Sequence, residues 1–100
     1  ASLEINYSSV ADLSPLADLP KLVFLRITHS EVKDLSPLAG LKSLSQVNLA
    51  HNHIEDISPL LNTRAVSIIL TGNPLHDASL NAQVPALRKR GVGVYLDSEY

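Results

Sequence analysis

Histidines recur at a fixed spacing in this sequence, and their imidazoles can bind metals or respond to pH. Tyr7, His29 and His51 are each 22 residues apart, and His53 lies two residues beyond His51. No carboxylate obviously completes a ligand set around them. We therefore expect a ladder of stacked surface rings at a turn rather than a metal site.

A second ladder consists of carboxylates. Asp12, Asp34, Asp56 and Asp77 follow one another at steps of 22, 22 and 21 residues. Such a column could bind calcium, but the oxygen-rich, glycine-bearing loops typical of calcium sites are missing. Each Asp precedes a turn and can accept turn N–H groups, which lets close like charges coexist. The aspartates are thus predicted to be structural, and no metal or other cofactor is expected.

The sequence lacks the parts of a catalytic site. Catalysis requires a nucleophile, an oriented base or a metal inside a pocket. Cysteine is absent, only four glycines occur, and no G-x-S-x-G, H-E-x-x-H or phosphate-binding glycine loop is found. We predict that the chain is not an enzyme.

Composition restricts the class of protein further. One hundred residues with 45% hydrophobic and 18% charged side chains predict one globular domain. A net charge of −2 with eight Lys and Arg argues against nucleic acid as a partner. No apolar run approaches the roughly 20 residues of a membrane span, so no membrane insertion is expected.

An internal repeat explains the recurring residues. DLSPL occupies 12–16 and 34–38, DISPL occupies 56–60, and residues 19–40 align with 41–62 over their whole length. Residues 1–18 are most of an earlier repeat, and a later repeat, shortened by one residue, runs to 77. The sequence therefore predicts about four coils over 1–77, the first of them incomplete.

Each repeat predicts one coil of a solenoid. In Val47-Asn48-Leu49 the alternation directs Val47 and Leu49 inward and Asn48 outward, as in a short strand. Ser58-Pro59 then indicates a short helical turn, because Ser can cap free N–H groups and Pro suits the first turn. One coil cannot bury its leucines alone, so successive coils must stack and their strands form a parallel sheet.

Residues 3–75 resemble the 22-residue leucine-rich repeats of bacterial internalins and of the related phosphatase-regulator class, and the shared D-L/I-S-P-L ending carries the resemblance. It implies an α/β solenoid, a right-handed coil with a parallel sheet on the concave face and short 3-10 or helical turns on the convex face. The family's inward asparagine is present as Asn52 and Asn73, whereas Ser8 and Ser30 replace it. The compartment stays open between the cytoplasm and a secreted or cell-surface location.

Residues 78–100 depart from the repeat and are predicted to be a C-terminal cap of a helix and a short strand. A helix over 78–90, begun by Asp77 or Ser79 and ended by Gly91, is expected to kink or divide at Pro85. Its apolar face is predicted to cover the last coil, and a strand follows; the residues concerned are Leu80, Val84 and Leu87 in the helix and Val92, Val94 and Leu96 in the strand.

The opposite end shows no capping segment, because the sequence begins inside a predicted strand at Ala1. We expect this N-terminal edge either to continue upstream or to be covered by another chain.

The outer face of the sheet is the candidate binding surface, since the repeat places polar, aromatic and Arg side chains there in register. We predict a protein partner, of unknown identity, at this concave face, with Phe24 exposed. The alternative is a structural spacer or scaffold segment of a larger bacterial surface protein or enzyme. Cations at Lys21, Lys42, Arg64 and 88–90 are expected to form a solvated rim. The candidate partner-binding residues are Glu4, Phe24, Arg26, Gln46, Asn48, Ile69 and Tyr95.

Overall fold

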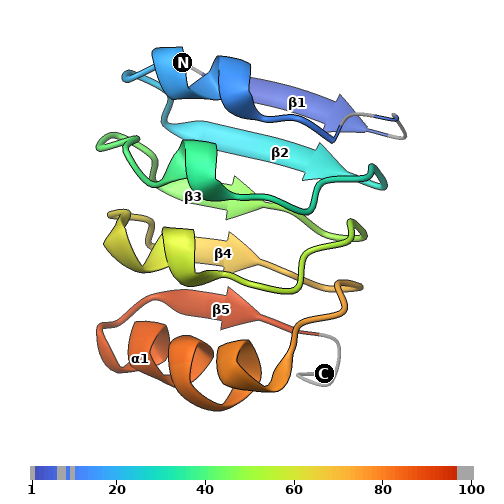
Figure 1. Cartoon of the computed structure of the whole chain (residues 1–100). Coiled ribbons are helices and arrows are strands. Elements are labelled where there is room, and N and C mark those ends of the chain that lie inside the picture. Colours follow the sequence, from blue (N-terminus) through green and yellow to red (C-terminus); the bar gives the residue numbers. More distant parts are fainter. Residues whose placement is uncertain (1, 7–8, 10, 97–100) are drawn as a thin grey trace.

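The computed structural model describes residues 2–6, 9 and 11–96. It contains one parallel sheet in the order β1-β2-β3-β4-β5, and each of the first four strands leads through a turn into a short helical segment (Figure 1). The strands are β1 (Ser2–Asn6), β2 (Phe24–Thr28), β3 (Gln46–Asn48), β4 (Ser67–Ile69) and β5 (Gly93–Tyr95). The helical segments are η1 (Ser14–Asp18), η2 (Ser36–Leu38), η3 (Ser58–Asn62), η4 (Ser79–Gln83) and α1 (Val84–Lys89).

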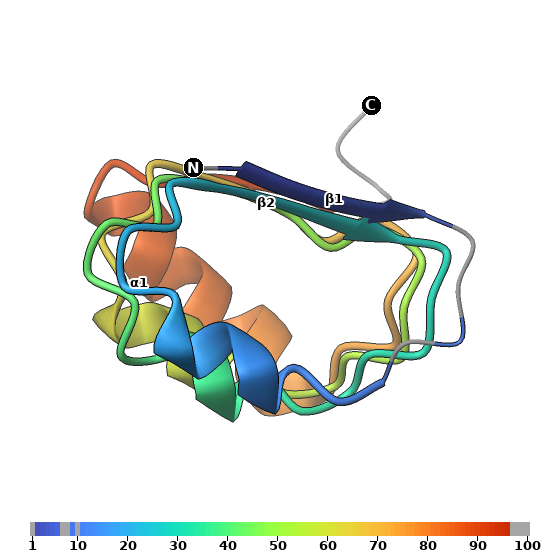
Figure 2. The same ribbon diagram turned by 90° about the horizontal axis from the view of Figure 1, so that it is seen from above.

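The coils stack so that the sheet forms one wall and the helical segments form the other (Figure 2). Apolar side chains at equivalent positions of successive coils fill the space between the walls. Leu25, Ile27, Val32, Leu35 and Leu38 of one coil are at most 1% exposed. Their counterparts in the next coil are buried as well. The hydrophobic core is therefore continuous through the stacked coils, which confirms the predicted solenoid.

The start of each helical turn differs in one respect from the prediction. Ser58 was expected to cap the turn, but its own N–H donates to Asp56 Oδ1 at 3.0 Å and its hydroxyl also donates to the Asp56 carboxylate. The same pattern joins Ser36 to Asp34, with an N–H to Oδ1 distance of 2.9 Å. Aspartate therefore accepts the turn N–H, because its ionised oxygens are stronger acceptors than a hydroxyl.

The inward asparagines join neighbouring coils. Asn52, which is 4% exposed, donates through Nδ2 to the carbonyl oxygens of Ile27 and Leu49 at 2.8 and 2.9 Å and accepts the Val32 N–H at 3.2 Å. Asn73 makes the equivalent bonds one coil later, to the carbonyls of Leu49 and Leu70 and from the Ile54 N–H. Ser30 reaches less far, because its hydroxyl donates to Thr28 of its own coil. Ser8 lies outside the described residues.

The predicted cap helix is divided at Pro85. Residues up to Gln83 form a π-helical segment, in which the Val84 N–H donates to the Ser79 carbonyl, and α-helix begins at Val84. Proline has no N–H, and its ring collides with the carbonyl four residues earlier in a regular α-helix. The wider π turn before Pro85 relieves that collision.

The π turn also changes which residues face the core. Val84 and Leu87 are each 1% exposed, as predicted, but Leu80 is 40% exposed. A π turn spaces stacked side chains by five residues, so Ser79 and not Leu80 lies above Val84. Ser79 is fully buried and does not cap the helix: its hydroxyl accepts the Ile57 N–H at 3.3 Å. The helical run begins at Asp77, and the side chain that bonds its first turn is His76, whose Nδ1 accepts the Ser79 N–H at 3.3 Å, so the predicted capping by Asp77 or Ser79 is wrong.

The helix ends as predicted at Gly91, whose φ of 88° is in the left-handed region that glycine tolerates best. The N–H of Val92 donates to the Leu87 carbonyl and that of Gly91 donates to the Arg88 carbonyl. This is a Schellman motif, and it turns the chain into β5. Val94 in β5 is buried, while Val92 and Leu96, which flank the strand, are half-buried against the core.

Candidate functional site

The concave face, which we define by its outward residues Glu4, Phe24, Arg26, Gln46, Asn48, Ile69 and Tyr95, has the register predicted from the repeat. Phe24 pairs with Gln46 along the stack, and Glu4 with Arg26. The column of Glu4 and Arg26 continues through Asn48 and Ile69 to Tyr95. One side of the sheet therefore presents all seven residues, because alternate side chains of each strand point to the same face.

Exposure differs along this face. Glu4, Arg26 and Gln46 are exposed, whereas Asn48 and Ile69 are half-buried between neighbouring strands. Phe24 was predicted to be exposed but is half-buried as well.

An ion pair joins the first two strands on this face. Arg26 Nη1 lies 3.6 Å from Glu4 Oε1, and the two side chains are 46% and 53% exposed. An ion pair as exposed as this contributes little to stability, about 0–1 kcal/mol. Both charges thus stay accessible to a polar partner.

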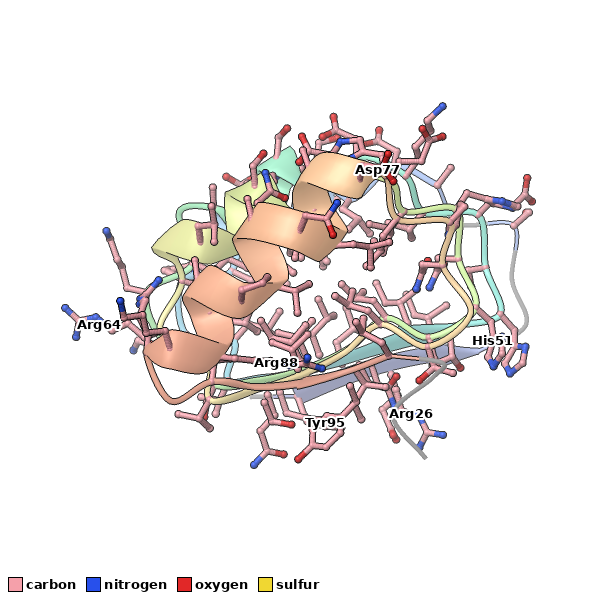
Figure 3. All side chains as sticks on the ribbon, turned by 90° about the horizontal axis from the view of Figure 1, so that it is seen from below. Arg26, His51, Arg64, Asp77, Arg88 and Tyr95 are labelled. Atoms are coloured by element: carbon pink, nitrogen blue, oxygen red, sulfur yellow. The ribbon has the colours of Figure 1, made fainter. Side chains whose placement is uncertain are left out.

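Tyr95 occupies the far end of the face. It is 47% exposed, and Figure 3 shows it projecting on the same side of the sheet as Arg26. Its ring lies across Gly93: a Cβ on Gly93 would be 3.2 Å from the Tyr95 hydroxyl oxygen. The missing side chain at Gly93 therefore makes room for the ring, a packing effect that the repeat pattern does not reveal.

Beside Tyr95 an open cavity of about 450 Å³ runs along β5 and the end of the cap helix. Arg88 lines it and donates from Nη2 to the Val94 carbonyl at 2.8 Å. Arg88 is exposed, as expected of the solvated rim, but its side chain turns toward the sheet (Figure 3). By bonding a carbonyl of the last strand, Arg88 hinders further strand pairing at this edge.

The predicted histidine ladder is present as a pair. The rings of His29 and His51 stack with centroids 4.5 Å apart and an interplanar angle of 15°. Both residues have left-handed φ angles, 52° and 59°, and the next coil has Gly72 at the same position with φ 78°. Figure 3 places His51 at the edge where the strands end. Tyr7 lies outside the described residues.

Asp12, Asp34 and Asp56 act in turns, as predicted, whereas Asp77 is the first residue of the helical run of the cap. Hydrogen bonds from the hydroxyl and the N–H of Ser14 lower the pKa of Asp12, and those from Ser36 lower the pKa of Asp34. The N–H of Ser58 is the main cause of the lowered pKa of Asp56. The negative charge of Asp12 raises the pKa of Asp34 only as the weakest contribution. Each carboxylate is thus stabilised locally despite the column of like charges.

Within 2–6, 9 and 11–96, no group of three or more His, Asp and Glu side chains is arranged to hold a metal ion. In the same part of the chain, no helix is both long enough and apolar enough to cross a membrane.

Known structures share this architecture. Over 89% of its length the chain is similar to an internalin (inlF) of Listeria monocytogenes, with 32% sequence identity and a TM-score of 0.74. Over 88% of its length it is similar to internalin C2 of the same species, with 33% identity and a TM-score of 0.75. The chain spans 25% and 38% of those two internalins. No protein-family model and no curated protein sequence matches it.

Proposed function

We propose that this chain, an internalin-like leucine-rich-repeat protein, recognises a protein partner through its concave face. The register of the face supports the proposal: five strands hold Arg and aromatic side chains in fixed columns at about 4.8 Å spacing. A rigid sheet loses little conformational entropy on binding, and Arg and Tyr are the residue types that contribute most at interfaces. The similarity to Listeria internalins supports a bacterial protein with an interaction role.

The experiment first identifies a partner. A photoreactive amino acid replaces Gln46 on the concave face or, as a control, Ser36 in a turn on the opposite wall; both are exposed. Each version is irradiated in bacterial and animal cell extracts. A protein that crosslinks at Gln46 and not at Ser36 is then purified, and its affinity for the unlabelled chain is measured.

The affinity is compared between two variants. Arg26→Ala/Tyr95→Ala removes two exposed concave side chains and should weaken binding about thirtyfold or more. Lys33→Ala/Leu80→Ala removes an exposed cation and an exposed apolar residue elsewhere and should leave affinity unchanged. Equal binding by both variants would refute the concave-face proposal and favour a structural spacer or scaffold segment. That the chain is not an enzyme stays a prediction.

We also propose that a further strand, from an upstream coil or from another chain, covers the outer edge of β1. A cavity of about 300 Å³ opens there between Leu3, Leu19 and Leu22. Leu3 and Ile5 are only half-buried, whereas their counterparts Leu25 and Ile27 are fully buried. Sedimentation and amide hydrogen exchange test this edge: a monomer of residues 1–100 whose β1 amides exchange as slowly as those of β3 would contradict the proposal.

A further inference from the structure

Charge is segregated between the two edges of the solenoid. The strand-start edge consists of the loops 19–23, 40–45, 63–66 and 89–92, which lead into β2 to β5, and the strand-end edge consists of 29–34, 51–56 and 71–77. Figure 3 shows Arg64 at the first edge, beside the end of the cap helix, and His51 at the second. The exposed cations of the strand-start edge are Lys21, Lys42, Arg64, Lys89 and Arg90.

The strand-end edge has the opposite charge. Asp12, which occupies the repeat position of Asp34 in the first coil, belongs to this edge as well. The exposed acidic residues of the edge are Asp12, Glu31, Asp34, Glu55, Asp56 and Asp77. Among the described residues of this edge, Lys33 is the one Lys or Arg, and its Nζ lies 3.5 Å from Glu55 Oε2. Within the described residues neither Lys42 nor Arg64 has an ion-pair partner. The acidic residue nearest to these loops in sequence is Asp18, which directly precedes the loop 19–23. A chain with a formal charge of only −2 thus carries a concentrated positive surface.

Exposed apolar side chains lie among these cations. Val23 and Val66 are 42% and 59% exposed. They occupy equivalent positions, since the Ser45 N–H donates to the Val23 carbonyl and the Val66 N–H donates to the Ser45 carbonyl, both at 2.8 Å. Leu19 of the same edge is 44% exposed, whereas every valine and leucine of residues 24–49 is buried. The two valines therefore lie in one column along the stack, separated by Ser45 of the coil between them, and Lys42 and Arg64 precede Ser45 and Val66 in the same loops.

The edge is held rigidly at its C-terminal end. Arg90 Nη1 donates to the Leu61 carbonyl oxygen at 2.6 Å, which ties the end of the cap helix to the preceding coil. The bond fixes Arg90, at the end of the cap helix, relative to the coil that contains η3. An extended segment running along the stack would meet a cation or a valine at each coil, about every 4.8 Å.

We propose that the strand-start edge is a second protein-binding surface, and that it takes a segment in which acidic and apolar side chains alternate. Acidic side chains would meet Lys42 and Arg64, and apolar ones would cover Val23 and Val66. The strand-start edge adjoins the concave face, because Val23 directly precedes Phe24, the first residue of β2. One partner can therefore contact both this edge and the concave face. The surface nevertheless stands independently of the proposed concave-face function.

A peptide selection tests the proposal without a known partner. A random twelve-residue phage library is selected on the purified chain, and the peptides that bind are synthesised and titrated. Peptides enriched in Asp, Glu and apolar residues are expected. Their affinity should fall about tenfold, equivalent to about 1.4 kcal/mol, for Lys42→Glu/Arg64→Glu, and should be kept by the charge-preserving Lys42→Arg/Arg64→Lys. Val66→Ser should weaken the same peptides without changing their salt dependence.

The controls separate this surface from others. Circular dichroism confirms that each variant is folded, and Lys42→Gln/Arg64→Gln replaces the charge reversal if that variant unfolds. Peptides without acidic enrichment, or equal binding to the charge-reversed variant, would overturn the proposal. Loss of binding in Arg26→Ala/Tyr95→Ala alone would also overturn it while supporting the concave face. A twelve-nucleotide oligothymidylate that binds as tightly as the peptides would show that charge alone is recognised.

Discussion

Replacing Asn52 by Ala is expected to be among the most destabilising single changes in this chain, although it removes a polar and not an apolar side chain. The Asn52 amide satisfies backbone groups of two neighbouring coils at once. Alanine leaves the backbone free to keep its path but supplies no donor and no acceptor. Water cannot easily replace the amide, because the side chain is almost completely buried.

The magnitude follows from the bonds that are lost. Two donor bonds to the Ile27 and Leu49 carbonyls, a longer one to the Ala50 carbonyl at 3.3 Å and one acceptor bond from the Val32 N–H disappear. Each buried hydrogen bond contributes about 1 kcal/mol, and a buried group left without a partner costs about 1–3 kcal/mol. The free energy of unfolding should therefore fall by about 3–5 kcal/mol, a large part of the roughly 5–15 kcal/mol of a typical domain.

The matched control is Asn48→Ala. Asn48 is half-buried on the concave face, and its Oδ1 accepts only the Ala50 N–H of its own coil, at 3.2 Å. Its replacement should cost about 1 kcal/mol or less. Urea unfolding followed by circular dichroism compares the two variants with the parent chain. A loss below about 1.5 kcal/mol for Asn52→Ala, or equal losses for both variants, would refute the argument that the amide bridges coils.

Two further predictions concern the turns. Gly72→Ala should cost more stability than Gly91→Ala, although both glycines have left-handed φ angles, because the new Cβ at 72 collides with the His51 ring and that at 91 meets nothing within 4 Å. Thermal melts of the double variant Gly72→Ala/His51→Ala should recover part of the difference, and no recovery would exclude the collision as its cause. The lowered pKa values of the three turn aspartates predict stability that is fully present above the unfolded value near 3.9 and is lost as pH falls through the folded values. The melting temperature of the parent chain should thus drop more steeply below about pH 4 than that of a variant with Asn at all three positions; parallel curves would contradict this.

The sequence was sufficient to predict the solenoid and the sheet register. A 22-residue period can bury its leucines only if successive coils stack in phase, so the period alone aligns Phe24 with Gln46 and Arg26 with Asn48. The columns of the concave face followed directly. The Asp–Ser turns were also accessible, since carboxylates before a turn have a well-known local bonding pattern.

The cap was predicted less completely, because its details depend on contacts between distant residues. The expected helical period placed Leu80 in the core, but the collision at Pro85 introduces a π turn that exposes Leu80 and buries Ser79. Nothing in the local sequence indicates that Arg88 bonds a carbonyl of the last strand.

The sequence by itself thus determined the coil, its period and the face each strand presents, because these depend on periodicity that is local or repeated. Only the tertiary structure decided how far Phe24 is covered, that Tyr95 lies over Gly93, and that cations and exposed valines gather at one edge. Those features arise where loops and the cap helix meet in space. Stacking brings the Arg90 side chain to the Leu61 carbonyl oxygen, although the two residues are far apart in the sequence and belong to no common repeat position.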